Sequence, residues 1–406
     1  MDVKQLQGQP LILVSRSALL HNAKLIRRCL APATKICAVI KADAYGHGAW
    51  IVADTLCNFS MGPSDAPVVD QLAVASIEEA AALPQVPVPV LVLRPVENAY
   101  VGNARSAIEL AMQSSWILTI DTAAAAGDVA RIAMAMGKRA LVNVMVDTGM
   151  TRGGCAIEQL SDLLARIESH SSLRLVNLGT HFANAELPGD PATRKQLSDF
   201  RGATDAFACA HAMKIRRHAA SSGAVFFTAS SHFDMVRPGI ALYGIDPTGK
   251  ACIDRALRPV MKWTAPLIGV RDVTAGASIG YGQTFVAPRA MRVGLVPVGY
   301  ADGYCRAFSN RTEMVVNGIA CPVIGRVSMD LTTIDLTPVP HATIGDEVTI
   351  LDNDPLSPAS VYRLARIAET IPYEILSRVG ARVRRVAVEP TDQAIASHRE
   401  DSYTPS

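Results

Sequence analysis

The chain has 406 residues, 49% of them hydrophobic and 19% charged, with a formal net charge of +2. This length favours two domains over one core, and the near-neutral charge gives no electrostatic basis for a nucleic-acid or membrane partner. The N-terminal residues lack a basic stretch followed by a long apolar run, so we expect neither a signal peptide nor a membrane span. The eight cysteines form no C-x-x-C pair and no metal-ligand spacing, which predicts reduced thiols, no metal site and a cytoplasmic location.

Short β-branched runs alternate with amphipathic segments over the first 250 residues. A first strand is expected at 11–15, and the eight strands expected to alternate with helices are 36–41, 72–75, 89–93, 117–120, 140–146, 174–180, 215–220 and 235–244. The expected helices are 17–30, 48–58, 76–83, 103–113, 122–137, 156–169, 190–212 and 223–229. One helix start, Ser76 with Glu79 three residues later, is a capping-box pattern. Eight strands alternating with helices predict a TIM-like (β/α)8 barrel over 11–250, although an open doubly wound sheet gives a similar pattern.

The pattern changes after about residue 250, where strand-like runs separated by Gly, Asn and Pro turns predominate. The expected strands here are 261–273, 291–299, 313–316, 320–324, 328–336 and 346–352, with one helix near 358–370. These runs predict a mostly antiparallel β domain over 251–390, with residues 1–10 as a candidate packing partner. The polar residues 391–406 are expected to form a frayed tail.

The segment CAVIKADAYGHG places Lys41 at the expected end of the first barrel strand. Active sites of such barrels lie at the C-terminal ends of the strands. Apolar neighbours remove solvation from an ammonium group, so the pKa of the lysine falls and its amine becomes a nucleophile. Taken alone, this residue is more simply interpreted as a strand-end lysine that reaches solvent.

Several segments together resemble the alanine racemase family, in the order of its motifs and over nearly the whole chain. In the barrel they are AVIKADAYGHG, DTGMTRGG, LGTHFANAE, AASSGAV and VRPGIALYG. In the second domain they are SIGYGQTF, GYADGY, GRVSMD and PYEIL. The resemblance implies a pyridoxal-phosphate (PLP) enzyme of fold type III that interconverts L- and D-alanine as a homodimer with shared active sites.

The resemblance also implies a role for each matched residue. Lys41 is the cofactor lysine and one catalytic base, and Tyr281, from the partner subunit, is the other. The implied cofactor-binding residues are Lys41, Tyr45, Arg152, His181, Ser222, Arg237, Gly239, Ile240 and Tyr373, with Tyr243 nearby. Of these, Tyr45, Ser222 and the backbone amides of Gly239 and Ile240 are implied to bind the cofactor phosphate. The implied substrate-binding residues are Arg152, Tyr300 and Met329. A chain Tyr281–His181–Arg237 is implied to assist the tyrosine.

Arg237 is expected to face the pyridine nitrogen of the cofactor. Because an arginine stays protonated, that nitrogen must accept a hydrogen bond and remain unprotonated, which disfavours side reactions such as transamination. Taken singly, Arg237 could be a salt-bridge residue, His181 a core histidine, Tyr281 a packing aromatic and Met329 core filler. Their joint occurrence in one sequence favours the functional interpretation.

Three positions depart from the family pattern. Met145 stands where the family commonly has a carbamylated lysine, and Ser221 where it usually has asparagine; Asp43 is a variant that the family tolerates. A thioether cannot balance the charge of Arg152, so we expect a bound anion such as chloride, or a nearby carboxylate, to do so.

Other functions remain open at this point. A broader-specificity or serine racemase would use the same chemistry. Basic-amino-acid decarboxylases and D-threonine aldolases have the same barrel type, but the SIGYGQTF segment argues against both. A non-catalytic PLP-binding protein is a further alternative, and the second domain with its tyrosine argues against it.

Overall fold

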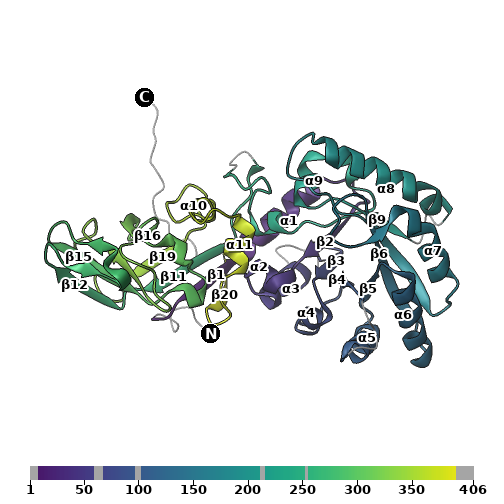
Figure 1. Ribbon diagram of the computed structural model, residues 1–406, viewed down its shortest axis with the longest axis horizontal. Coiled ribbons are helices and arrows are strands. Elements are labelled where there is room, and N and C mark those ends of the chain that lie inside the picture. The colour runs from purple at the N-terminus through teal and green to yellow at the C-terminus, as the bar shows by residue number, and fades with distance from the viewer. Residues whose placement is uncertain (1–7, 59–66, 97–101, 211–214, 252–254, 390–406) are drawn as a thin grey trace.

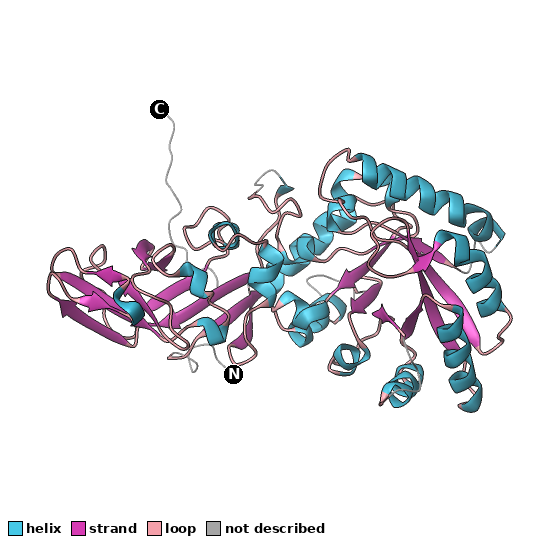
Figure 2. Cartoon of the chain, viewed as in Figure 1, coloured by secondary structure: helices cyan, strands magenta, loops and turns pink. Residues whose placement is uncertain are grey.

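The computed structural model describes residues 8–58, 67–96, 102–210, 215–251 and 255–389. A barrel and a largely β part occupy opposite ends of an elongated molecule (Figure 1). Helices surround the strands of the barrel, whereas strands predominate in the other part (Figure 2). The described helices include none with the length and hydrophobicity that a membrane span requires.

Eight parallel strands close the barrel within the described residues. They are β2 (Lys35–Val39), β3 (Gln71–Val74), β4 (Val90–Pro95), β5 (Ile117–Ile120), β6 (Ala140–Asp147), β8 (Leu173–Gly179), β9 (Arg216–His218) and β10 (Met235–Val236). Their order is β5-β4-β3-β2-β10-β9-β8-β6, and pairing of β5 with β6 completes the ring. The closed ring confirms the predicted (β/α)8 barrel and excludes the open sheet. The short strand β7 (Cys155–Ala156) adds to β6 outside the ring.

The helices that alternate with these strands also match the prediction in number and position. They are α1 (Arg16–Arg28), α3 (Ala49–Cys57), α4 (Ile77–Ala81), α5 (Ala104–Gln113), α6 (Ala123–Ala135), α7 (Leu160–Glu168), α8 (Pro191–Ala210) and α9 (Ser222–Phe227). Alternate strand residues face inward and outward. Cys37, Leu91, Ile117 and Met235 pack together in one buried cluster inside the ring.

Three barrel strands, β2, β9 and β10, are shorter than predicted. β10 stops at Val236, because Pro238 has no N–H for the ladder, and the chain continues into the 3-10 turn η4 (Ile240–Tyr243). β2 stops at Val39, so Lys41 lies beyond the strand and opens the short element α2 (Lys41–Tyr45).

The second part is mostly antiparallel, as predicted. Its six-stranded sheet has the order β17 (Ile319–Pro322), β16 (Glu313–Val316), β19 (Glu347–Leu351), β11 (Met261–Pro266), β1 (Leu11–Ser15) and β20 (Arg384–Val388). A three-stranded sheet contains β12 (Gly269–Val273), β15 (Met291–Val296) and β18 (Thr332–Asp335), and β13 (Ser278–Ile279) pairs with β14 (Phe285–Val286). The predicted helix near 358–370 is α10 (Val361–Ile367), and α11 (Pro372–Ser377) follows it.

The first described strand belongs to the second part and not to the barrel. Strand β1, expected within the barrel unit 11–250, pairs with β11 and β20 instead. Its LILVS run is buried on nearly every residue, as a strand between two neighbours requires. The division near residue 250 stays a prediction. The expected tail, 391–406, and residues 1–7 lie outside the described residues.

Candidate active site

Lys41 opens a left-handed turn. Residues Ala42–Tyr45 all have φ between 51° and 54°, a conformation that costs a residue with a side chain roughly 1–2 kcal/mol. The Gly46 N–H donates to the Ala42 carbonyl at 2.9 Å. Gly46 also lies so close to the Leu376 carbonyl of α11 that a Cβ there would overlap it. Contacts with the second part of the molecule therefore help to hold the turn that carries Lys41.

The Glu79 carboxylate ties this turn to strand β3. Its two oxygens accept from the backbone N–H groups of Ala42 at 2.9 Å and Ala75 at 2.7 Å. Ser76 Oγ accepts from the Glu79 N–H at 3.3 Å, so the predicted helix cap forms. The carboxylate, however, accepts from Ala42 and Ala75 and not from the Ser76 N–H, so only the serine half of the predicted capping box forms. No sequence pattern indicated the contact with the Lys41 turn.

The Lys41 amine lies in a partly buried, electropositive environment. Burial, followed by the charge of Arg152, lowers the pKa of Lys41, and the Glu79 carboxylate opposes this shift. A lower pKa leaves more of the amine uncharged at neutral pH, which is the form that acts as a nucleophile or base. The structure thus gives Lys41 the environment predicted for it.

Tyr45, at the end of the turn, reaches the loop that follows β10. A Cβ on Gly239 would overlap the Tyr45 hydroxyl, so this close approach requires glycine. Ser222 Oγ accepts from the N–H groups of Gly239 at 2.9 Å and Ala241 at 3.2 Å. Burial raises the pKa of Tyr45 to about 12, so its hydroxyl stays protonated and can donate.

The same corner contains the first turn of α9, which begins at Ser222. The first N–H groups of a helix have no acceptor within the helix and favour an anion. Ser222, Tyr45 and Ile240 of the predicted phosphate-binding set therefore converge here. The Gly239 N–H, also predicted to bind phosphate, is already donated to Ser222.

Arg237 is buried and bonded only to neutral acceptors. Its Nη2 donates to the Thr180 carbonyl at 2.6 Å and to His181 Nδ1 at 3.2 Å, and its Nη1 donates to His218 Nδ1. No described carboxylate forms an ion pair with it, and no described acceptor bonds its Nε. Burial lowers the pKa of Arg237 to about 10, which leaves it a cation at neutral pH.

His181 occupies the position predicted next to Arg237. Burial, and then the charges of Arg237 and Arg152, lower the pKa of His181 to about 3. The imidazole is therefore neutral at physiological pH and accepts from the arginine. This contact supports the Arg237 end of the implied Tyr281–His181–Arg237 chain.

Two more predicted tyrosines complete this side of the site. Tyr243 is fully buried, donates to the Val39 carbonyl at 3.0 Å and packs against Tyr45 with ring centroids 4.9 Å apart. Tyr373 arrives from α11, and its ring lies 6.1 Å from that of Tyr45. The second part of the same chain therefore contributes a residue to the barrel site.

Arg152 lies in the loop after β6. The Asp147 carboxylate orders this loop by accepting from the N–H groups of Gly149 and Met150, each at 2.9 Å. Arg152 itself is exposed and makes no ion pair or hydrogen bond with another described residue. Half-buried Met145 offers it no charge. The alternative of a carboxylate partner thus finds no support within the described residues, and a bound anion remains the prediction.

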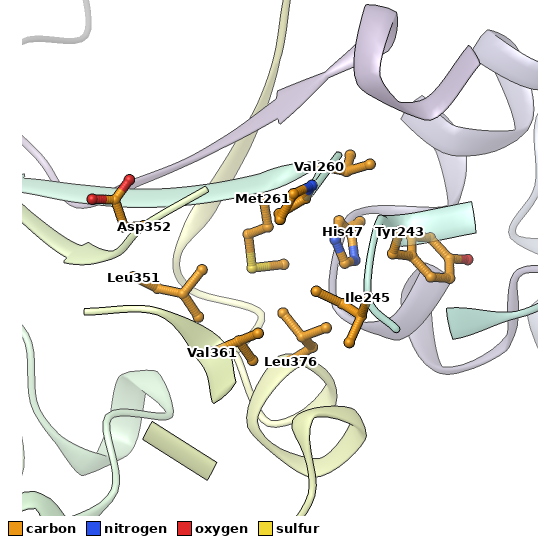
Figure 3. Close-up of a pocket in the computed structure, with 10 residues that line it drawn as sticks. His47, Tyr243, Ile245, Val260, Met261, Leu351, Asp352, Val361 and Leu376 are labelled. Carbon is orange, nitrogen blue, oxygen red and sulfur yellow. The ribbon is translucent and has the colours of Figure 1, made fainter. Parts of the chain in front are cut away.

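A small cavity lies behind the Lys41 turn. His47 and Tyr243 from the barrel face Met261 and Leu376 across it (Figure 3). Its lining is mostly apolar and contains none of the predicted catalytic residues, so we assign it no part in the chemistry. His47 Nδ1 donates to the Ala44 carbonyl at 2.9 Å and so helps to hold the left-handed turn.

Three predicted residues lie elsewhere, in the second part, and all are exposed. The exposed fractions are 72% for Tyr281, 43% for Tyr300 and 54% for Met329. The strand that leads to Tyr281 packs in one cluster with β15, at the end of the molecule away from the barrel (Figure 1). One chain therefore does not bring Tyr281 to Lys41.

These three residues nevertheless occupy neighbouring loops. The Tyr300 N–H donates to the Ser328 carbonyl at 3.0 Å, which places Tyr300 beside the loop that carries Met329. Gly280, before Tyr281, packs against Arg326 at the start of that loop.

Two residues contribute to the site although the sequence analysis assigned them no role in it. They are His218 and Glu79, whose carboxylate joins Ala42 to Ala75 and is called the Glu79 clamp below. His218, which bonds Arg237, lies on β9 opposite Gly179, where a Cβ would overlap its imidazole. The glycine in LGTHF was the one available signal, because it marks a close approach.

The chain matches the family models "Alanine racemase, N-terminal domain" over residues 14–247 and "Alanine racemase, C-terminal domain" over residues 260–387. The chain belongs to the alanine racemase family. An alanine racemase from Chlorobaculum tepidum is 35% identical over 93% of this chain and 94% of its own length.

Solved structures of the family share the architecture. The alanine racemase from Streptomyces coelicolor is 33% identical, with a TM-score of 0.83 over 95% of this chain and 100% of its own. That from Bartonella henselae, with covalently bound pyridoxal phosphate, is 28% identical, with a TM-score of 0.79 over 94% of this chain and 100% of its own.

Proposed function

We propose that the chain is a PLP-dependent racemase that interconverts L- and D-alanine. The observation that carries the proposal is Arg237, a buried cation with neutral acceptors alone. Burial, and then the charges of Arg152 and Arg237, lower the pKa of Lys41 in the same pocket. A buried arginine without an acid is costly unless another acceptor meets it. The pyridine nitrogen of PLP is an acceptor that suits the unbonded Nε.

The rest of the pocket fits the same cofactor. Tyr45, Ser222 and the first turn of α9 form a corner that suits a phosphate group. Lys41 suits the aldehyde, since its lowered pKa makes it a nucleophile. When bound, PLP would supply an electron sink that acidifies the Cα–H bond of the substrate.

Two proton-transfer groups would then act on opposite faces of the substrate α-carbon. Lys41 Nζ removes or delivers the proton on one face, and the Tyr281 hydroxyl does so on the other. Arg152, exposed on its loop, holds the substrate carboxylate. His181, neutral and bonded to Arg237, accepts a hydrogen bond without adding a second cation.

This scheme requires a homodimer in which each site takes Tyr281, Tyr300 and Met329 from the partner. Support comes from their exposure, since large hydrophobic side chains on adjacent loops are typical of a surface that meets another one. Such a two-fold interface would contain two equivalent sites.

The test uses the purified protein with PLP. Borohydride reduction followed by peptide mapping should place a pyridoxyl group on Lys41; a label on a different lysine would overturn the proposal. Single enantiomers of alanine in deuterated water should lose optical activity as they gain α-deuterium. Faster exchange with serine would indicate a serine racemase, and labelling without any exchange would indicate a non-catalytic PLP-binding protein.

A further inference from the structure

A line of buried polar side chains leads from Arg237 into the barrel. Arg237 Nη1 bonds His218 Nδ1, and His218 Nε2 lies 2.9 Å from Asn143 Oδ1. Asn143 Nδ2 donates to Thr119 Oγ1 at 2.9 Å, and that hydroxyl donates to the Val92 carbonyl at 2.6 Å. Thr119, Asn143 and His218 are completely buried, so water does not compete for these bonds.

Both ends of this line demand the same direction of donation. A guanidinium only donates, so His218 Nδ1 must accept and its proton must be on Nε2. A backbone carbonyl only accepts, so Thr119 must donate to Val92 and can only accept from Asn143 Nδ2. That orientation turns Asn143 Oδ1 toward His218 Nε2, and this oxygen accepts the hydrogen bond from the Nε2–H.

We propose that Asn143 is a positioning residue that fixes the neutral Nε2–H tautomer of His218 and thereby holds Arg237 toward the cofactor. The other two forms of His218 would place an N–H against the arginine donor, and the doubly protonated form would also add a second positive charge. An amide is suited to this role, because it presents an acceptor to the histidine without a charge that would stabilise the imidazolium.

The two substitutions at Asn143 separate these effects. Asn143→Asp keeps the shape but adds a negative charge, which favours protonation of His218 on both nitrogens and repels Arg237 from it. Asn143→Leu removes the acceptor without adding charge. We expect Asn143→Asp to weaken PLP binding about ten- to a hundredfold and Asn143→Leu less, because a buried bond to a charged group is worth about that factor.

Thr119 supplies a matched pair at the far end of the line. Thr119→Val removes the hydroxyl and should weaken PLP binding in the same direction as Asn143→Leu, whereas Thr119→Ser keeps it and should resemble the wild type. Asn177 is the control for a buried amide in general. It is completely buried and paired with Asn143 in the strand register, yet its side chain has no hydrogen-bond partner among the described residues. Asn177→Leu should leave PLP affinity unchanged.

The decisive measurement does not need the cofactor. Ring-nitrogen NMR shifts of 15N-histidine-labelled apoprotein report the tautomer of His218, assigned by difference with His218→Gln. The wild type should show the Nε2–H form and Asn143→Asp the imidazolium. PLP affinity and the pH dependence of the bound cofactor's absorption are then measured for each variant.

The role toward the cofactor depends on the proposed function, but the tautomer does not. Wild-type protein that shows the Nε2–H form but binds no PLP would overturn the proposed function and leave the tautomer assignment standing. A neutral Nε2–H histidine in Asn143→Asp, together with unchanged PLP affinity, would overturn the positioning role. Equal losses in Thr119→Ser and Thr119→Val would also count against it, since the hydroxyl would then be irrelevant.

Discussion

The predicted active-site residues fall into two groups with opposite environments. Those of the barrel, such as Arg237 and Ser222, are mostly buried and hydrogen-bonded to neighbouring groups, with the exposed Arg152 as the exception. Tyr281, Tyr300 and Met329, in the second part, are exposed, and no hydrogen bond among the described residues joins their side chains to the barrel group. One folded chain holds the first group in place, whereas the proposed function requires the second group to meet the barrel of a partner subunit.

The two groups differ in how much folding free energy they cost. The barrel group contains the expensive features, namely a buried cation, neutral histidines and four consecutive left-handed residues, and each needs fixed partners. The exposed group carries a phenol and a thioether on ordinary loops, which need little support. Substitutions in the barrel group should therefore change both stability and activity, and those in the exposed group activity alone.

The largest expected effect comes from separating the two groups. Lys41→Ala and Tyr281→Phe should each lower racemase activity about 10²- to 10⁴-fold, because each removes a proton-transfer group. Tyr281→Phe should leave the unfolding temperature unchanged, since the side chain is 72% exposed. If each site draws on two chains, refolding an equal mixture should recover roughly a quarter of wild-type activity, because heterodimers contain one intact site.

The same mixture defines the contrary result. Mass spectrometry first establishes that heterodimers have formed. Racemase activity of the mixture no greater than the sum of the two variants would then mean that one chain supplies both residues. Two Lys41 variants refolded together serve as the control, since they can form no intact site.

Acid should destabilise the barrel in preference to the second part. Burial lowers the pKa of His47 to about 4 and that of His181 to about 3, and it lowers the pKa of His218 well below its ordinary value. As pH falls below about 6.5, the unfolded chain takes up protons that the folded barrel excludes. Each histidine then lowers the free energy of unfolding by up to about 1.4 kcal/mol per pH unit, until the pH reaches the pKa of that histidine in the folded protein.

Urea unfolding between pH 7 and pH 4 measures this slope. His47→Gln should reduce it, whereas His341→Gln, at an exposed position in the second part, should not. A free energy of unfolding that is flat over this range would show that the three histidines are not buried as neutral groups.

The Glu79 clamp should also stabilise the barrel group specifically. Glu79→Gln replaces a carboxylate that accepts from two N–H groups by an amide with one acceptor oxygen. We expect a loss of about 1–2 kcal/mol in the free energy of unfolding, because one of two bonds to a charged group is lost, of which one is exposed and the other half-buried. Removing its charge should also lower the pKa of Lys41 and move the acidic limb of the kcat/KM profile to lower pH.

Glu78 is the matched control, since it is the adjacent acid on α4 and is exposed. Glu78→Gln should change stability by less than about 0.5 kcal/mol and leave the pH profile in place. Equal effects of the two substitutions would mean that Glu79 acts only through the charge of its helix.

Much of the barrel was predictable because its signals are local and repeated. Strand and helix runs alternate with the period of each element, and family motifs fix Lys41 and Arg237 in the chain. The left-handed turn and the Glu79 clamp were not predictable, because an αL run of non-glycine residues has no composition signal and depends on distant contacts such as Leu376. Strand β1 was placed within the barrel unit although it pairs in the other sheet, since LILVS indicates burial but not which strands it pairs with.

The smallest expected effect concerns the anion beside Arg152. With Met145 in place of a carbamylated lysine and no described carboxylate bonded to Arg152, a bound halide is expected to balance the arginine. Replacing chloride by a large organic anion at constant ionic strength should then raise KM for alanine a few-fold, because a surface charge contact is worth about 1 kcal/mol or less. Met145→Glu should make KM independent of chloride, while Met145→Leu should keep the dependence. A wild-type KM that does not depend on chloride would show that solvent alone screens Arg152. This exposed arginine would then differ from the buried arginine of the barrel, Arg237, whose bonds are all to protein groups.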